Sequence, residues 1–123
     1  MKTKEHISLI GAGLSGPVMA SYLSSLGFST DIYESRSDMR RNSTLAGRSI
    51  NLALSARGIK ALKDIGVYEK IKPTLIPMSG RMIHDGNGDV HFQPYGQKKN
   101  EVIYSVPRSN LNKTLMDYAE STN

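Results

Sequence analysis

Hydrophobic and polar positions follow the periods of a strand, a helix and a second strand along the first third of the chain. The short apolar run His6–Ile10 predicts a buried strand, and residues 17–26 carry apolar side chains at helical spacing. Residues 28–34 alternate between apolar and polar positions, which predicts a second strand. A glycine-rich turn at 11–16 separates the first strand from the helix. This order predicts a βαβ unit with two parallel strands.

The remaining two thirds of the chain predict a mixture of strands and helices. Four segments have the alternation or the β-rich composition of strands: 49–54, 78–84, 90–95 and 102–106. Three segments have helical spacing: 55–65 with Ser55 as its cap, the short turn 67–71, and a C-terminal helix capped by Ser109. The sequence Asp85-Gly86-Asn87-Gly88 predicts a hairpin turn. The polar stretch 35–47 predicts a long loop. Asn51 interrupts an apolar strand, so we expect it to be buried with backbone or cofactor partners.

The C-terminal helix predicts an incomplete fold. Its apolar side chains form one face, and the chain ends at Asn123, where a parallel α/β sheet would continue with a further strand. Hydrophobic residues make up 38% of the chain, which is low for a sheet covered by helices on both faces. We therefore expect a fragment whose last helix has nothing to pack against.

The glycine turn has the pattern of a dinucleotide-binding site. Gly11, Gly13 and Gly16 form G-x-G-x-x-G between the first strand and its helix. Gly11 permits the tight turn, Gly13 lets a pyrophosphate approach the backbone, and Gly16 lets the helix pack closely. Glu34 ends the second strand, where a carboxylate accepts hydrogen bonds from a ribose and repels a 2′-phosphate. The pattern favours FAD or NAD over NADP, and a ligand-free structural turn is the alternative interpretation.

Composition and charge exclude several other kinds of site. The chain has no cysteine and three histidines without metal-ligand spacing, so we expect no disulfide, no metal site and no thiol nucleophile. No apolar run approaches the ~20 residues of a membrane span, and we expect a cytoplasmic protein without a signal peptide. The net charge of +5 lacks the basic stripe of a nucleic-acid interface. We expect five arginines to surround an anionic cofactor instead: Arg36, Arg40, Arg41, Arg48 and Arg57.

Longer motifs resemble one family. The segment Gly-Arg-Ser-Ile-Asn-Leu-Ala-Leu-Ser at 47–55 resembles the signature of kynurenine 3-monooxygenases, which are single-component aromatic hydroxylases that use FAD. Shorter matches follow in the same order: Ile76-Pro77-Met78, Arg81-Met82-Ile83-His84, Pro94-Tyr95-Gly96 and Arg108-Ser109-Asn110-Leu111-Asn112-Lys113. The resemblance therefore covers essentially the whole chain.

The resemblance implies roles for individual residues. Beside the glycines, it implies cofactor contacts for Ser15, Tyr33, Glu34, Ser35, Arg36, Ala53 and Arg108. It implies that Arg81 and Tyr95 bind the carboxylate of L-kynurenine, since arginine offers a charged fork and tyrosine a neutral donor. His84 and His91 are interpreted as structural. The flavin performs the oxygen transfer in this family, so we assign no catalytic side chain.

The resemblance also implies the fold and the reaction. We expect an α/β fold: a Rossmann-like FAD-binding βαβ unit with an added β-hairpin or substrate-sheet segment, truncated. Three parts are expected: 1–72 for the dinucleotide and flavin, 73–106 for the start of a substrate-binding β region, and 107–123 for a helix returning to the FAD domain. The implied reaction is 3-hydroxylation of L-kynurenine with FAD, NADPH and O₂.

Two alternatives stay open. The chain could belong to a related FAD hydroxylase acting on another aromatic acid, or to a non-catalytic dinucleotide-binding domain; the unpacked face of the last helix argues against the second. Since the second cofactor motif of the family is absent, we expect the 123 residues alone to bind FAD weakly or not at all and to lack hydroxylase turnover.

Overall fold

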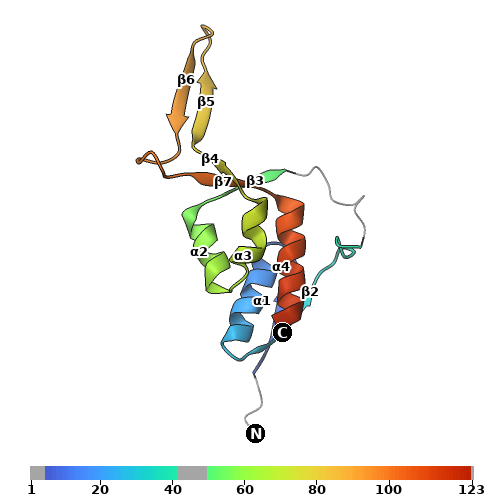
Figure 1. Cartoon of the computed structure of the whole chain (residues 1–123). Coiled ribbons are helices and arrows are strands. Elements are labelled where there is room, and N and C mark those ends of the chain that lie inside the picture. The colour runs from blue at the N-terminus through green and yellow to red at the C-terminus, as the bar shows by residue number, and fades with distance from the viewer. Residues whose placement is uncertain (1–4, 42–49, 123) are drawn as a thin grey trace.

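The computed structural model describes residues 5–41 and 50–122. Helices gather on one side of the molecule, and a long β-hairpin projects from the other side (Figure 1). The elements are, in chain order, β1 (His6–Ile10), α1 (Ser15–Ser25), β2 (Ser29–Tyr33), β3 (Asn51–Leu54), α2 (Ala56–Asp64), α3 (Tyr68–Ile71), η2 (Lys72–Thr74), β4 (Ile76–Met78), β5 (Gly80–His84), β6 (Val90–Pro94), β7 (Ile103–Pro107) and α4 (Arg108–Thr122).

The predicted βαβ unit is present. Strands β1 and β2 are parallel, in a register that runs from His6 opposite Ser29 to Ile10 opposite Tyr33. Helix α1 connects them and begins at Ser15, two residues before the predicted start. Pro17 lies in the first turn of the helix, where its missing N–H costs no hydrogen bond. Gly27 follows the helix with a φ of +91°, as a left-handed helix terminator does.

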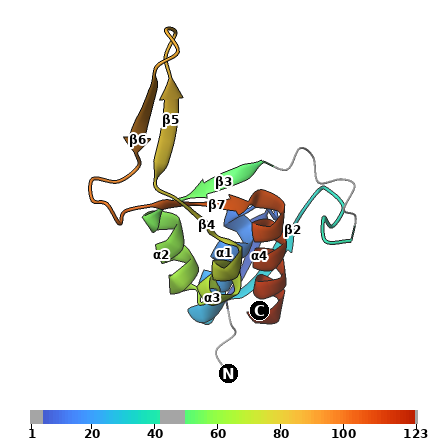
Figure 2. The same cartoon turned by 45° about the horizontal axis from the view of Figure 1, so that its top comes forward.

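The β-rich part of the chain forms two antiparallel sheets. Strands β3, β7 and β4 make a three-stranded sheet with β7 in the centre, and β5 pairs with β6 to form the hairpin. The sequence pattern assigned Met78 to the hairpin, but Met78 ends β4 and pairs with Ile103 of β7. The hairpin begins two residues later, at Gly80, and the turn at 85–88 is where it was predicted. Figure 2 shows the hairpin standing away from the helices beyond this sheet.

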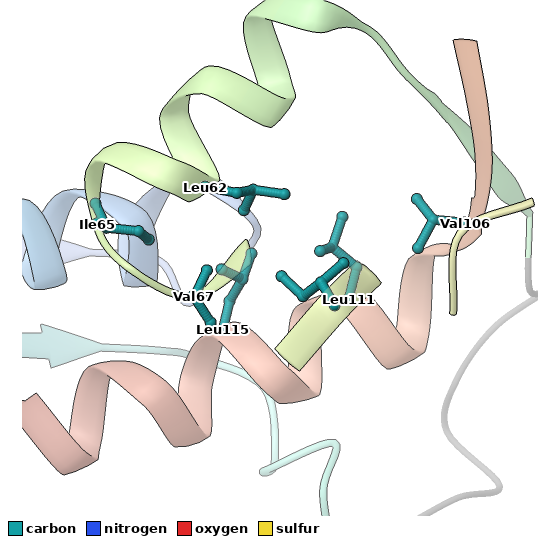
Figure 3. Close-up of a cluster of buried hydrophobic side chains, with 7 residues drawn as sticks. Leu62, Ile65, Val67, Val106, Leu111 and Leu115 are labelled. Atoms are coloured by element: carbon teal, nitrogen blue, oxygen red, sulfur yellow. The ribbon is translucent and has the colours of Figure 1, made fainter. Parts of the chain in front are cut away.

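The hydrophobic core lies among α2, α3, α4 and β7. Its buried side chains are Leu62, Ile65, Val67, Ile71, Val106, Leu111 and Leu115. Figure 3 shows Leu111 and Leu115 of α4 facing Leu62 of α2 and Val67. The expectation that the last helix has nothing to pack against is therefore wrong, because Leu115 is only 2% exposed. The helix also packs along α1, and Tyr118 Oη donates a hydrogen bond to the carbonyl oxygen of Ile65 at 2.7 Å.

Three local expectations are corrected. Ser109 does not cap α4, since the helix already begins at Arg108, directly after Pro107. Ser55 occupies the cap position of α2, but its side chain makes no capping hydrogen bond. Asn51 is exposed rather than buried, since it opens β3 with its side chain on the outward face of the strand. Among the described residues, no helix is both long and apolar enough to span a membrane.

Candidate functional site

The glycine turn joins β1 to α1 through two different backbone constraints. Gly11 has a φ of +100°, a left-handed conformation that favours glycine, and its N–H donates to the carbonyl oxygen of Tyr33 at 2.7 Å. A Cβ on Gly16 would overlap the carbonyl oxygen of Gly11, whereas Ile32 of β2 lies 4.0 Å away. Gly16 is thus required chiefly by the closure of the turn itself, and less by the approach of helix to strand.

Gly13 differs from both of these glycines. It does not have a positive φ, and a Cβ built on it would meet no atom within 4 Å. Nothing in the described part of the fold therefore requires glycine at this position. The open space beside its Cα belongs to a cleft that Gly13 lines.

The start of helix α1 is available to an anion. Leu14 occupies the cap position and no side chain caps the helix. The first N–H groups of an α-helix have no partner within the helix, and they carry the positive end of its dipole. A pyrophosphate beside Gly13 would satisfy them, which is the arrangement that phosphate-binding helices use.

Glu34 lies at the end of β2 and is held by four donor atoms, one of which is Arg36 Nη2, 3.1 Å from Oε2. Its Oε2 accepts a hydrogen bond from the N–H of Ala12 at 2.9 Å, which links it to the glycine turn. Its Oε1 accepts from the N–H and the Nε of Arg36, both at 2.9 Å. The Arg36 side chain, the Arg36 N–H and the Ala12 N–H hold the pKa of Glu34 well below its usual range. Glu34 is therefore an ionised acceptor at neutral pH, beside the open space at Gly13.

A cleft of about 940 Å³ opens between the end of β2, the segment after it, and helix α4. Four predicted cofactor residues line it: Gly13, Glu34, Arg36 and Arg108. Arg108 comes from the first turn of α4, more than 70 positions after Glu34 in the chain, so only the fold brings them together. The volume is in the range of ordinary small-molecule sites, which span about 300–1,000 Å³.

Sequence reasoning missed the contribution of α4 beyond its first residue. Asn112 lines the cleft, is 4% exposed, and donates from Nδ2 to the carbonyl oxygen of Ala12 at 3.0 Å. Met39 and Met116 also line the cleft, with their sulfur atoms 3.0 and 3.3 Å from that nitrogen. A signal was available, because Asn112 follows Arg108 by one helical turn and shares its face.

Other predicted cofactor residues lie outside the cleft. Ser15 lines a separate apolar groove between α1, α2 and α4, and Gly11 and Gly16 shape the turn without lining the cleft. Tyr33, Ser35 and Ala53 are exposed and do not line it. Of the five arginines expected around the cofactor, Arg36 and Arg40 line the cleft, and the expectation is wrong for Arg41 and Arg57, which do not. Arg48, with Gly47 and Ser49 of the signature segment, lies outside the described residues.

The two predicted substrate residues lie together on the hairpin. Arg81 is opposite Gln93, and its Nε donates to Gln93 Oε1 at 2.7 Å. Tyr95 continues the ladder, since its N–H donates to the carbonyl oxygen of Ser79 at 3.0 Å. Side chains two residues apart on a strand share a face, so Arg81 and Tyr95 are diagonal neighbours, typically about 7–8 Å apart. The hairpin register therefore puts both on one face, and neither residue lines the cleft.

Comparison with known proteins gives one family over almost the whole chain. Residues 4–123 match the family described as FAD binding domain. The chain is 48% identical over 120 residues to a kynurenine 3-monooxygenase of Cytophaga hutchinsonii, and 46% identical over 116 residues to one of Legionella pneumophila. These alignments cover 96% and 94% of this chain. They cover 26% of each relative, so the chain spans about a quarter of their length. The resemblance found in the motifs is confirmed.

Solved structures give the same fold. The chain superimposes over its whole length on 30% of 2-methyl-3-hydroxypyridine-5-carboxylic acid oxygenase, with a TM-score of 0.79 and 18% identity. It superimposes over 99% of its length on 31% of p-nitrophenol 4-monooxygenase from Pseudomonas putida, with a TM-score of 0.73 and 16% identity. At these identities the likeness shows the fold alone, and it confirms the predicted α/β class.

Proposed function

Because this chain belongs to the family of FAD-binding domains, we propose that it holds the ADP half of FAD within an NADPH-dependent aromatic monooxygenase. The single observation that carries the proposal is that Gly13, Glu34 and Arg108 line one cleft. We keep the division into 1–72 for dinucleotide and flavin, 73–106 for the start of the substrate region and 107–123 for the returning helix. The N-terminal part of a kynurenine 3-hydroxylase fits this division best.

The residues present fit FAD. The uncapped start of α1 and the open space at Gly13 suit a pyrophosphate, and Arg108 adds a cation on the facing wall of the cleft. The ionised Glu34 suits the two hydroxyls of the adenosine ribose, and its charge disfavours a 2′-phosphate. Ser15, Tyr33, Ser35 and Ala53 are not cleft residues, so in this proposal they contact parts of FAD that lie beyond the cleft.

When bound, FAD supplies the oxygen-transfer chemistry of such an enzyme, with NADPH as reductant and O₂ as oxygen source. The residues of this chain bind the cofactor and the substrate and orient them relative to each other. Arg81, oriented by Gln93, offers a charged fork to a carboxylate, and Tyr95 adds a hydroxyl donor on the same face. The proposed substrate is L-kynurenine, an amino acid whose carboxylate matches this pair. A hydroxylase for another aromatic acid is the second candidate, because the same pair would bind any such carboxylate.

Replacing Glu34 with glutamine is expected to weaken FAD binding about tenfold or more. The change preserves the shape and the acceptor for Ala12 but removes the charge, and hydrogen bonds to charged groups contribute about 1.5–3 kcal/mol. Titration followed by flavin fluorescence or NMR measures the effect. Glu69→Gln is the matched control, since Glu69 is an exposed residue of α3 whose ion pair with Lys72 lies away from the cleft. Equal affinities for both variants would contradict the role of Glu34.

Replacing Arg81 with methionine is expected to raise the KM for L-kynurenine by about 10-fold to 100-fold, because a charge-assisted carboxylate contact contributes about 1.5–3 kcal/mol. Flavin content should stay unchanged, since Arg81 lies outside the cleft. The measurement is substrate-dependent NADPH oxidation coupled to hydroxylation, made in the intact hydroxylase that the proposal implies. Lys98→Met, which removes an exposed cation beyond the hairpin, is the control. Assays with other aromatic acids separate the two candidate substrates, and an unchanged KM would remove Arg81 from the substrate site.

A further inference from the structure

Arg40 carries a network of ion pairs that the proposed function does not use. Its guanidinium donates to Asp38 at 2.7 Å, to Asp117 at 3.0 Å and to Glu120 at 2.8 Å. Two nitrogens contact Glu120 together, Nη1 with Oε2 and Nη2 with Oε1, which makes the pair bidentate. The Arg40 side chain is only 21% exposed. One cation is thus held by three carboxylates.

The network joins two parts of the chain that form opposite walls of the cleft. Asp38 belongs to the same segment as Arg40, just after the end of β2 that bears Glu34. Asp117 and Glu120 belong to α4, three residues apart on one face of the helix. Arg40 and Glu120 themselves line the cleft. Within residues 5–41 and 50–122, this network and the contact of Met39 with Asn112 hold the segment after β2 against α4.

The contacts have the properties of a stable clamp. Isolated surface ion pairs contribute little, but networks with bidentate arginine geometry contribute more. Arg40 lowers the pKa of Asp38 to about 2 and also lowers the pKa of Glu120. A depressed carboxyl pKa means that the pair with Asp38 stabilises the fold above about pH 4 and is lost as the pH falls through about 2. The clamp is therefore fully charged at neutral pH.

We propose that Arg40 is a positioning residue for the cofactor, an inference that rests on the proposed function. Its ion pairs with Asp117 and Glu120 fix the segment after β2 against α4 and so hold Glu34 at the position that the adenosine ribose requires. Arg40 contacts no reacting atom, and it acts through Glu34 and the width of the cleft.

Two variants separate this role from a simple effect of charge. Arg40→Met breaks the clamp and leaves three carboxylates unbalanced, which repels an anionic ligand. Asp117→Asn with Glu120→Gln weakens the link to α4, because neutral amide oxygens replace the two carboxylates, but it also removes two negative charges, which favours an anionic ligand. Positioning predicts weaker binding in both cases, whereas charge alone predicts opposite signs. Arg41→Met is the matched control, since Arg41 is the neighbouring arginine, its side chain is 86% exposed, and it only approaches Asp38 at 4.0 Å.

The probe is ADP, titrated to about 10 mM and followed by the NMR shifts of the Ala12 and Gly13 amides, so that a weak, millimolar Kd is measurable. We expect both clamp variants to raise the Kd by at least about fivefold, because small misplacements of binding groups have effects of this size or larger. Arg41→Met should stay within about twofold of the parent protein, as a surface substitution does. Thermal unfolding of each variant checks that the fold is retained; Asp117 and Glu120 are 68% and 70% exposed, so their amides should fold.

Coupling to Glu34 distinguishes positioning from a general structural role. In a protein that already carries Glu34→Gln, Arg40→Met should add little further loss, because the two changes act on one contact. Fully additive losses, opposite effects of the two clamp variants, or a Kd equal to that of Arg41→Met would each overturn the inference. Absence of any ADP shift in the intact hydroxylase, to which the expected weak binding of the 123 residues alone does not apply, would instead overturn the proposed function before the clamp is tested.

Discussion

Replacing Gly13 with valine in the full protein is expected to abolish flavin retention while leaving the fold intact. The valine Cβ and methyl groups would occupy the cleft beside the start of α1, where no protein atom lies within 4 Å of the Cβ position. A pyrophosphate could then no longer reach the N–H groups of the turn. Losing two charge-assisted hydrogen bonds costs roughly 3 kcal/mol or more, which corresponds to about 100-fold weaker binding.

Titration with FAD and with ADP measures the loss, and thermal unfolding measures the fold. The melting temperature should change by no more than about 5 °C, since the substitution costs about 1 kcal/mol at most where φ is compatible and space is open. Gly86→Val is the matched control, because Gly86 lies in the hairpin turn, lacks a positive φ and has equally open space. Normal FAD affinity in Gly13→Val would place the pyrophosphate elsewhere.

Replacing Gly16 with alanine is expected to destabilise the fold, although it adds only one methyl group. The new Cβ would overlap the carbonyl oxygen of Gly11 and lie 3.2 Å from its carbonyl carbon. Both atoms are backbone within the turn, so no side chain can rotate away to make room. Overpacking of this kind costs about 1–3 kcal/mol and more when backbone must move. A loss of about 3 kcal/mol corresponds to a fall in melting temperature of roughly 10–20 °C.

Gly13→Ala provides the comparison in the same turn. It adds the same methyl group three residues earlier, in open space and without a positive φ. The two variants should therefore differ in stability. Gly16→Ala loses stability and with it ligand binding, whereas Gly13→Ala keeps its stability. Chemical denaturation of both proteins, with midpoints compared directly, measures the difference. Equal midpoints would contradict the close contact at Gly16.

The burial of the last helix bears on the choice between an enzyme and a non-catalytic dinucleotide-binding domain. Its apolar face was expected to be unpacked, and that expectation argued against a non-catalytic dinucleotide-binding domain. Leu111 and Leu115 are instead buried against α2 and the residues before α3. The helix is therefore no evidence against such a domain, and the preference for an enzyme depends on the relatives and on the Arg81–Tyr95 pair.

The sequence predicted those parts of the fold that local chemistry controls. Hydrophobic period placed β1, α1 and β2 to within about two residues, and glycine placed the turns because few other residues adopt a positive φ. The sequence did not predict the features that depend on contacts between segments distant in the chain. Met78 joins the sheet of β7 instead of the hairpin, and Asn51 points to the exposed face of β3. Strand pairing depends on which distant strand is adjacent, and single-segment periodicity does not contain that information.

By itself, the sequence determined the glycine turn between β1 and α1, the acid at the end of β2 and the family. Tertiary structure decided which residues meet. It brought Arg108 and Asn112 of α4 to the same cleft as Glu34, and it left Ser15 and Ala53 outside that cleft. It also joined Arg40 to two carboxylates nearly 80 positions later in the chain. The physical reason is that a turn depends on the conformations of a few adjacent residues, whereas the opposite wall of a cleft depends on how whole helices pack against a core.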